Sequence, residues 1–336
     1  MGNSYTALST QDNQDVLVNA QSRTGLRTSA SLYMKKPPVR RPAHHSDAIV
    51  CMAAQRVGMV ITGSRDRSMR LNNIDTGEVY MVWKGHEREV TKMSYRFRGG
   101  RHYIVSGSRD EKVMVWQFGL EAPVQTLCGH KMTVSGIATD EGEGGGDGGR
   151  GRGECTHLAY NSPTRLLAQS SEDKSVKLWD ERDLSIVAEF TKKNNIQTYC
   201  EWLPEGMHIL SCSNGFNGDG CEISGVPGTR EHRHLRLSPR MAFSQSQQFT
   251  QRRLILSTSY DKTVRVWNLD EGNCLWNHDG SEHHGALHAS LAFPDGCIVL
   301  AGDDGALVSM QMHARAGRPL LQTLAYTKQT KRTLED

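Results

Sequence analysis

The chain has 336 residues, enough for one large domain or two ordinary ones, which excludes a mini-protein held together by disulfides. Hydrophobic residues make up 37% of the chain, and no window reaches the roughly 18 consecutive apolar residues that a membrane-spanning helix needs. The formal net charge is +3. This is too close to balance for the chain as a whole to neutralise a nucleic acid, so any basic signal must be local.

The cysteines indicate a reducing compartment. They are scattered without any C-x-x-C spacing, and no secretory signal opens the sequence. We therefore expect reduced thiols in a cytoplasmic protein, with association to a membrane or a cilium as a further expectation. The eight cysteines are Cys51, Cys128, Cys155, Cys200, Cys212, Cys221, Cys274 and Cys297.

Residues 1–44 are expected to form a disordered polar and basic arm, because they show no periodicity long enough for a core element. The arm opens Met-Gly-Asn-Ser-Tyr-Thr, which fits the pattern for myristoylation of Gly2. One acyl chain binds a membrane only marginally, so a second signal is needed. A basic cluster supplies one in this hypothesis, formed by Lys35, Lys36, Arg40 and Arg41. The alternative is a plain solubilising linker.

A repeat of about 44 residues follows the arm. In each copy, apolar residues alternate before and after a polar turn, which predicts a β-hairpin. The turn aspartates stand at 66, 110, 173, 261 and 304. The copies are ITGSRDRSMRLNN (61–73), IVSGSRDEKVMVWQ (104–117), LAQSSEDKSVKLWD (167–180), LSTSYDKTVRVWN (256–268) and the weaker LAGDDGALVSM (300–310).

Gly-His and Trp-Asp dipeptides recur within the repeat, as Gly85-His86, Gly129-His130, Trp179-Asp180 and, with asparagine, Trp267-Asn268. In this the sequence resembles the WD-repeat family of β-propellers over roughly residues 45–326. The resemblance implies an all-β propeller whose four-stranded blades pack radially. Residues 327–336 are expected to be a C-terminal tail.

The resemblance also implies a hydrogen-bonded set of His, Ser, Asp and Trp in a blade. The set is complete only once, at His86, Ser106 or Ser108, Asp110 and Trp116. His130, Asp173 and Trp179 form a second set only if the Gly-rich insert between them is looped out. Asp66 lacks a tryptophan, because Asn72 occupies that position. Trp83 lies outside the repeat position and is expected to pack at the edge of a blade.

Two repeats depart from the pattern, so the seven blades that the family resemblance implies are not all expected. The third repeat is defective, because its first strand-like run, TVSGIAT (133–139), is followed by a Gly-rich insert at 140–153. The fifth is degenerate, with an irregular loop at 223–250 in place of a Trp-Asp strand. We expect six or fewer well-formed blades.

The residues just before the turn aspartates are candidates for a surface that binds a protein partner. Arginine and tyrosine are frequent in interface hot spots, and rigid sheets hold such loops in place. These candidates are Arg65, Arg109, Glu172, Tyr260 and Asp303. The alternative is a set of solvated turn residues.

The sequence has no P-loop, no G-x-S-x-G, no H-E-x-x-H and no H-x-E with C-x-x-C, which argues against an enzyme. We expect no catalytic residues, no metal, no cofactor, no small-molecule substrate and no nucleic acid, but a scaffold that binds other proteins. Three strings resemble one member of the family and imply a cilium-associated role in protein trafficking: GHEREVTK (85–92), NIQTYCE (195–201) and CSNGFNGDGCE (212–222). The alternative is a substrate-recognition subunit of a multiprotein enzyme such as a ubiquitin ligase.

Overall fold

The structure is a computed structural model. It describes residues 37–328 apart from 129, 131–132, 138–154, 184, 191, 204–205, 214–220, 227–234, 238–242, 250–253, 269–270, 272, 280–284 and 316–317. These described residues form strands β1 to β25 and one short 3₁₀ turn, Asp303–Gly305. Among them, no helix is long and apolar enough to cross a membrane. Gly2, Lys35, Lys36 and the insert at 140–153 lie outside the described residues.

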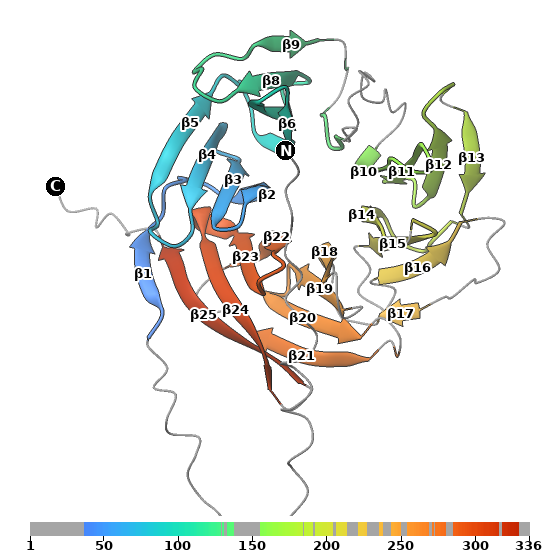
Figure 1. The fold of residues 1–336 in the computed structure, drawn as a ribbon. Coiled ribbons are helices and arrows are strands. Elements are labelled where there is room, and N and C mark those ends of the chain that lie inside the picture. Colours follow the sequence, from blue (N-terminus) through green and yellow to red (C-terminus); the bar gives the residue numbers. More distant parts are fainter. Residues whose placement is uncertain are drawn as a thin grey trace, which may run out of the picture.

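The strands form six sheets, which we number as blades 1 to 6 in chain order and which lie around a ring (Figure 1). Blade 1 holds β2 (Ile49–Arg56), β3 (Met59–Ser64), β4 (Ser68–Asn73) and β5 (Val79–Lys84). Blade 2 holds β6 (Val90–Arg98), β7 (Arg101–Ser108), β8 (Val113–Gln117) and β9 (Gln125–Leu127). Blade 3 holds β10 (Cys155–Asn161), β11 (Leu166–Ser171), β12 (Val176–Asp180) and β13 (Ile186–Glu189).

The second half of the chain continues the same order. Blade 4 holds β14 (Gln197–Trp202), β15 (His208–Ser213), β16 (Cys221–Gly225) and β17 (Leu235–Leu237). Blade 5 holds β18 (Phe243–Phe249), β19 (Leu254–Ser259), β20 (Thr263–Asn268) and β21 (Cys274–Asp279). Blade 6 holds β22 (Leu287–Ala292), β23 (Cys297–Gly302), β24 (Leu307–Arg315) and β25 (Arg318–Lys328), with β1 (Val39–Pro42) as a fifth strand. The protein is therefore an all-β propeller with six blades among its described residues.

The second strand of each blade carries most of the core. Every residue of β3 and β19 is buried, because these strands lie between neighbouring blades on both faces. The outer strand β9 is exposed throughout. Close packing of the segment 133–137 against blade 2 also explains a glycine: a Cβ on Gly107 would lie 2.5 Å from a methyl group of Val134. The short apolar and serine-rich runs of the repeat are thus the interior of the ring.

The turn between the second and third strands has the same conformation in four blades. The residue after the turn aspartate has a positive φ of 67° to 72° in each: Arg67, Glu111, Lys174 and Lys262. The aspartate carboxylate accepts the backbone N–H two residues on, as Asp110 does from Lys112 at 3.0 Å. An aspartate side chain that bonds its own backbone in this way stabilises the turn. The aspartate of the Ser-x-Asp sequence therefore recurs because this turn needs its side chain.

The chain before blade 1 is part of the ring rather than of a free arm. β1 pairs in parallel with β25, from Val39 opposite Ala325 to Pro42 opposite Lys328. Arg41 donates from its guanidinium to the backbone oxygens of Ile74 at 2.6 Å and Asp75 at 2.5 Å, and so joins blade 6 to blade 1. The predicted arm, residues 1–44, is therefore too long. The polar sequence of this segment does not indicate a strand, because β1 is held only by backbone pairing with β25 on one edge.

The predicted irregular loop at 223–250 is also wrong as a description of the backbone. It contains β17 and β18 and the end of β16, which complete blades 4 and 5. An outer strand such as β17 pairs on one side, so a clear apolar alternation is not required for it. The fifth repeat is degenerate in sequence but still builds a four-stranded sheet.

One interface of the ring lacks a hydrophobic core among the described residues. Core clusters join blades 1 and 2, 3 and 4, 4 and 5, 5 and 6, and 6 and 1. No such cluster joins blades 2 and 3, and we call this interface the seam. Residues 133–137 lie in it: the Val134 N–H donates to Ser108 O at 3.1 Å, and the Ser135 hydroxyl donates to Cys155 O. The remnant of the defective third repeat therefore bridges the seam as an irregular segment.

Candidate functional site

The turn aspartates and the loops before each first strand lie on one face of the ring, which we call the aspartate face. In blade 2, His86 precedes β6 and reaches two side chains of its own blade. Its Nδ1 lies 2.9 Å from Asp110 Oδ2, and its Nε2 lies 2.7 Å from Ser106 Oγ. Trp116 donates from Nε1 to the same hydroxyl at 2.8 Å. The structure thus brings His86, Ser106, Asp110 and Trp116 together.

These contacts show that Ser106, and not Ser108, belongs to the hydrogen-bonded set. Ser108 does not join the four; its hydroxyl donates to Arg88 O at 3.2 Å and accepts the Asp110 N–H at 3.1 Å. Burial by itself raises the pKa of Asp110, but hydrogen bonds from His86 and from the backbone of Glu87 and Lys112 hold it below its ordinary value. The network therefore fixes an ionised aspartate under the loops.

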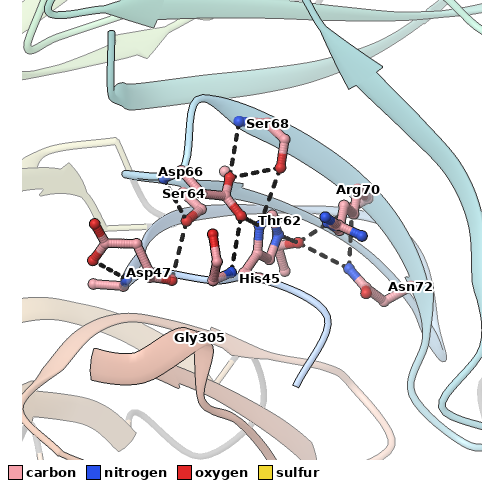
Figure 2. A network of polar contacts seen from close by, with 12 residues as sticks. His45, Asp47, Thr62, Ser64, Asp66, Ser68, Arg70, Asn72 and Gly305 are labelled. Atoms are coloured by element: carbon pink, nitrogen blue, oxygen red, sulfur yellow. Dashed lines mark hydrogen bonds and ion pairs between the residues drawn. The ribbon is translucent and has the colours of Figure 1, made fainter. Parts of the chain in front are cut away.

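Blade 1 contains a second complete network that the sequence analysis missed (Figure 2). His45 Nδ1 lies 2.8 Å from Asp66 Oδ2, and His45 Nε2 lies 2.8 Å from Thr62 Oγ1. Asn72 donates from Nδ2 to that hydroxyl at 2.9 Å, in the role that the indole N–H has in blade 2. The signal that was available is a histidine about twenty residues before a turn aspartate, without a preceding glycine.

Burial decides the charge of the blade 1 pair. It lowers the pKa of His45, against the raising effect of Asp66. Burial also works to raise the pKa of Asp66, but the hydrogen bonds from His45 and Ser68 together hold it below its ordinary value. Both side chains are hydrogen-bonded within the blade, which supports a rigid loop at this position.

The second set expected from His130, Asp173 and Trp179 is not formed. His130 is exposed, and Trp179 Nε1 is buried without a hydrogen-bond partner. Gln169 stands in blade 3 at the position that Ser106 has in blade 2. The Asp173 carboxylate instead accepts from the backbone and hydroxyl of Ser175. Because the preceding repeat is incomplete, no histidine of that repeat reaches blade 3.

The residues before the turn aspartates are placed as follows. Arg65, Arg109, Glu172 and Tyr260 are exposed at their turns, and Tyr260 keeps 46% of its surface open. Asp303 is half-buried and faces its own blade: its carboxylate accepts the Ala286 N–H at 3.0 Å and lies 2.8 Å from His288 Nε2. Arg109 lies 3.4 Å from Glu89 Oε1.

Tyr260 and Asp303 both contact His288, a residue that no repeat pattern singles out. The ring of Tyr260 from blade 5 meets His288 of blade 6 edge-on, with centroids 5.3 Å apart. Burial raises the pKa of Tyr260, while the charge of Arg65 lowers it and that of Asp303 raises it. We call Arg65, Tyr260, His288 and Asp303 the Tyr260 cluster. Arg109 and Glu172 lie on other blades and outside it.

The inner strands hold buried titratable groups but no activated nucleophile. Burial raises the pKa of the thiols of Cys51, Cys155 and Cys200 to about 12, so these cysteines remain protonated. Lys92 Nζ lies 5.8 Å from the centre of the Tyr199 ring, and burial lowers its pKa. In the described part of the chain, no group of three His, Cys, Asp or Glu side chains is placed to hold a metal ion.

Comparison with known proteins agrees with this architecture. The family described as WD domain, G-beta repeat, abbreviated WD40, matches residues 77–117, 149–180 and 240–268. The crystal structure of the computationally designed Ika8 protein superposes with a TM-score of 0.58 at 19% identity, over 81% of this chain and 98% of that one. Its likeness supports the fold alone. The described residues therefore form a β-propeller, and three stretches of the chain match the WD40 repeat.

Several curated proteins are similar over most of the ring. WD repeat-containing protein 18 of Homo sapiens is 22% identical over 68% of this chain and 51% of that protein. The DDB1- and CUL4-associated factor 13 of Danio rerio is 25% identical over 71% of this chain and 58% of its own length. Nuclear distribution protein PAC1 of Arthroderma otae is 24% identical over 77% and 58% respectively. The chain thus spans about half the length of these relatives.

Proposed function

We propose that the chain is a non-catalytic scaffold that binds a protein partner through the Tyr260 cluster. The observation that supports this is one exposed tyrosine of blade 5 that packs edge-on against His288 of blade 6, while the charge of Arg65 acts on the same phenol. Tyrosine and arginine on a rigid support are the side chains most enriched in interface hot spots. The histidine in turn is fixed by Asp303, so little side-chain entropy remains to be lost on binding.

A cilium-associated role in protein trafficking is our proposal for the biological setting. It depends on the three strings at 85–92, 195–201 and 212–222, which resemble segments of WD repeat-containing protein 31. The relatives reported above carry other names, so this setting is supported by those strings alone. We propose a cytoplasmic location for the chain, with recruitment to the cilium.

The second candidate is a substrate-recognition subunit of a multiprotein enzyme such as a ubiquitin ligase. The observation that favours it is the similarity to DDB1- and CUL4-associated factor 13 over 71% of this chain. The same Tyr260 cluster would then receive the substrate, so the two candidates differ in the partner and not in the surface.

Affinity purification from ciliated cells tests both candidates. We compare the wild-type chain with Tyr260→Ala combined with Arg65→Ala, and with Tyr80→Ala as the matched control, because Tyr80 is 53% exposed on the outer strand β5. Loss of ciliary trafficking components only in the double variant supports the first candidate, and loss of ligase subunits supports the second. An identical set of partners in all three samples would refute the role of the Tyr260 cluster.

We also propose that the chain is tethered to membranes through myristoylation of Gly2. Of the basic residues expected to help, Arg40 is exposed on β1, whereas Arg41 is engaged with the backbone of blade 1. Metabolic labelling with a myristate analogue, compared with Gly2→Ala, tests the tether. Absence of label on the wild-type chain would end the proposal.

A further inference from the structure

The face of the ring opposite the aspartate face carries an exposed apolar group. Successive turns of an antiparallel sheet alternate between its two ends, so the β2–β3, β6–β7 and β8–β9 turns all lie on this opposite face. Val124, 54% exposed, adjoins β9 in the β8–β9 turn, and one further exposed apolar side chain stands at each of the three turns: Val57 is 53% exposed, Phe97 62% and Leu120 48%. Phe97 is the most exposed large hydrophobic side chain among the described residues. We call these three side chains the basal patch.

A layer of packed aromatic side chains lies beneath the three turns and connects them. The Phe97 ring lies 4.8 Å from His102, and His102 lies 5.1 Å from Phe118, two residues before Leu120. The Tyr95 hydroxyl lies 2.6 Å from His102 Nδ1, within hydrogen-bond distance. It also forms a hydrogen bond with the side chain of Gln55, which is two residues before Val57. The basal patch therefore protrudes from a packed support, and its exposed side chains are not the fraying end of a loose loop.

Arginines surround the basal patch. Arg56 is exposed beside Val57, and Arg98 and Arg101 are exposed on either side of the glycine pair at the tip of the β6–β7 hairpin. No carboxylate occurs in the sequence between Glu89 and Asp110. The acidic residues nearby are Asp75, whose carboxylate lies beside Gly58, and Glu121 next to Leu120. Glu78 is exposed in the same β4–β5 turn as Asp75, so the turns of blade 1 carry both signs of charge, whereas the β6–β7 hairpin that bears Phe97 is basic.

We propose that the basal patch is a membrane-docking surface that inserts Phe97, Val57 and Leu120 into the interface of an anionic bilayer. Apolar side chains that enter the headgroup boundary, surrounded by cations that contact anionic lipid, are the combination that binds proteins to such surfaces. The proposal deepens the proposed membrane association, because a single acyl chain needs a second contact. It does not require that Gly2 be acylated.

The chemistry of the basal patch favours lipid over single-stranded nucleic acid. Nucleic-acid platforms use aromatic rings on which bases stack. Here two of the three protruding side chains, Val57 and Leu120, are aliphatic and offer no stacking surface. Aliphatic side chains do gain from entry into acyl chains, since the gain follows the apolar area removed from water.

Vesicle co-sedimentation of the unacylated full chain, made as Gly2→Ala, tests the proposal. One set of vesicles contains phosphatidylcholine alone, and the other contains phosphatidylcholine with about 30% phosphatidylserine. Both sets are tested at low and high salt. The variants are Phe97→Ala and the pair Arg98→Gln with Arg101→Gln. The matched controls are Tyr80→Ala for an exposed aromatic and Arg67→Gln with Arg88→Gln for two exposed arginines on the aspartate face.

We expect binding to the anionic vesicles only, weakened about tenfold by Phe97→Ala and about 30-fold by the arginine pair. The controls should bind as the wild type does, and the salt dependence should fall in the arginine variant. Absence of vesicle binding, or equal losses in the controls, would overturn the proposal. So would binding to a 20-residue polyuridylate that depends on Phe97 without binding to vesicles. Gly2 labelling is unaffected by any of these results, so the two membrane proposals fail separately.

Discussion

Asn72 donates a hydrogen bond from Nδ2 to Thr62 Oγ1 at 2.9 Å, and it does so at the position that Trp116 occupies in the next blade. In both blades the acceptor is the hydroxyl ten residues earlier, and the same hydroxyl contacts a histidine ring nitrogen. A small amide thus replaces an indole without loss of the bond. The network is defined by the positions of its donors and acceptors and not by the residue types that usually supply them.

Replacing Thr62 tests whether this network stabilises blade 1. Thr62→Val keeps the shape but removes the hydroxyl that His45 and Asn72 both use, so the free energy of unfolding should fall by about 1–3 kcal/mol. Thr62→Ser keeps the hydroxyl and should cost less than about 1 kcal/mol for the lost methyl group. Urea denaturation of the two variants measures the difference. Equal losses would show that the hydroxyl contributes nothing.

Two buried tryptophans separate packing from hydrogen bonding. Trp83 and Trp116 are 1% and 0% exposed and belong to the same core cluster, but only Trp116 has a partner for its indole N–H. We expect Trp116→Phe to destabilise the protein by about 1–3 kcal/mol more than Trp83→Phe, since the first loses a buried hydrogen bond to Ser106, whereas the second removes an indole N–H that has no partner. Thermal unfolding checks this. A larger loss for Trp83→Phe would contradict the role of the indole bond.

Glu201 should make stability depend on pH. Burial raises its pKa from 4.5 to about 8, so the folded chain retains a proton that the unfolded chain loses. The stability of the wild type relative to Glu201→Gln should therefore be highest below pH 4.5. It should fall as the pH rises from 4.5 to about 8, by at most about 1.4 kcal/mol per pH unit.

Denaturation of both proteins across that range measures the effect. Glu121→Gln is the control, because Glu121 is exposed. A difference between Glu201→Gln and the wild type that does not change with pH would contradict the burial of an ionisable carboxyl at this position.

Truncations test the strand that closes the ring. Removing residues 1–36 leaves β1 in place and provides the reference melting temperature. Removing residues 1–44 also deletes β1 and the Arg41 bonds to blade 1, and should cost about 2 kcal/mol or more. Scanning calorimetry of both chains checks this. The same melting temperature for both would show that β1 adds no stability.

Much of the fold was predictable, because the repeat encodes it locally. The alternation around each Ser-x-Asp predicts the second and third strands, and the Gly-His and Trp pair predicts the blade 2 network that the structure contains. The turn aspartates are visible in the sequence because they satisfy a backbone need of their own turn. These elements depend on residues close together in the chain.

The rest depends on partners that are distant in the sequence. β1 is a strand only because β25 offers it an open edge some 285 residues later, and nothing in Val39–Pro42 itself indicates this. His288 belongs to the Tyr260 cluster because blade 5 places a tyrosine against it. Trp83 is outside the repeat position, yet it is fully buried because blade 2 covers β5. The structural role of such residues depends on contacts between blades, which form only when the ring closes.

The seam changes how the ring should come apart. A closed ring has no end. Among the described residues, however, blades 2 and 3 share no core cluster, so the ring should behave as a curved row of repeats in the order 3, 4, 5, 6, 1, 2, with blades 3 and 2 as its end units. End units of such a row open before central ones. Amide hydrogen exchange should therefore be fastest in β8 and β12 and slowest in β19 and β23, so that blades 5 and 6 outlast the blades on either side of the seam.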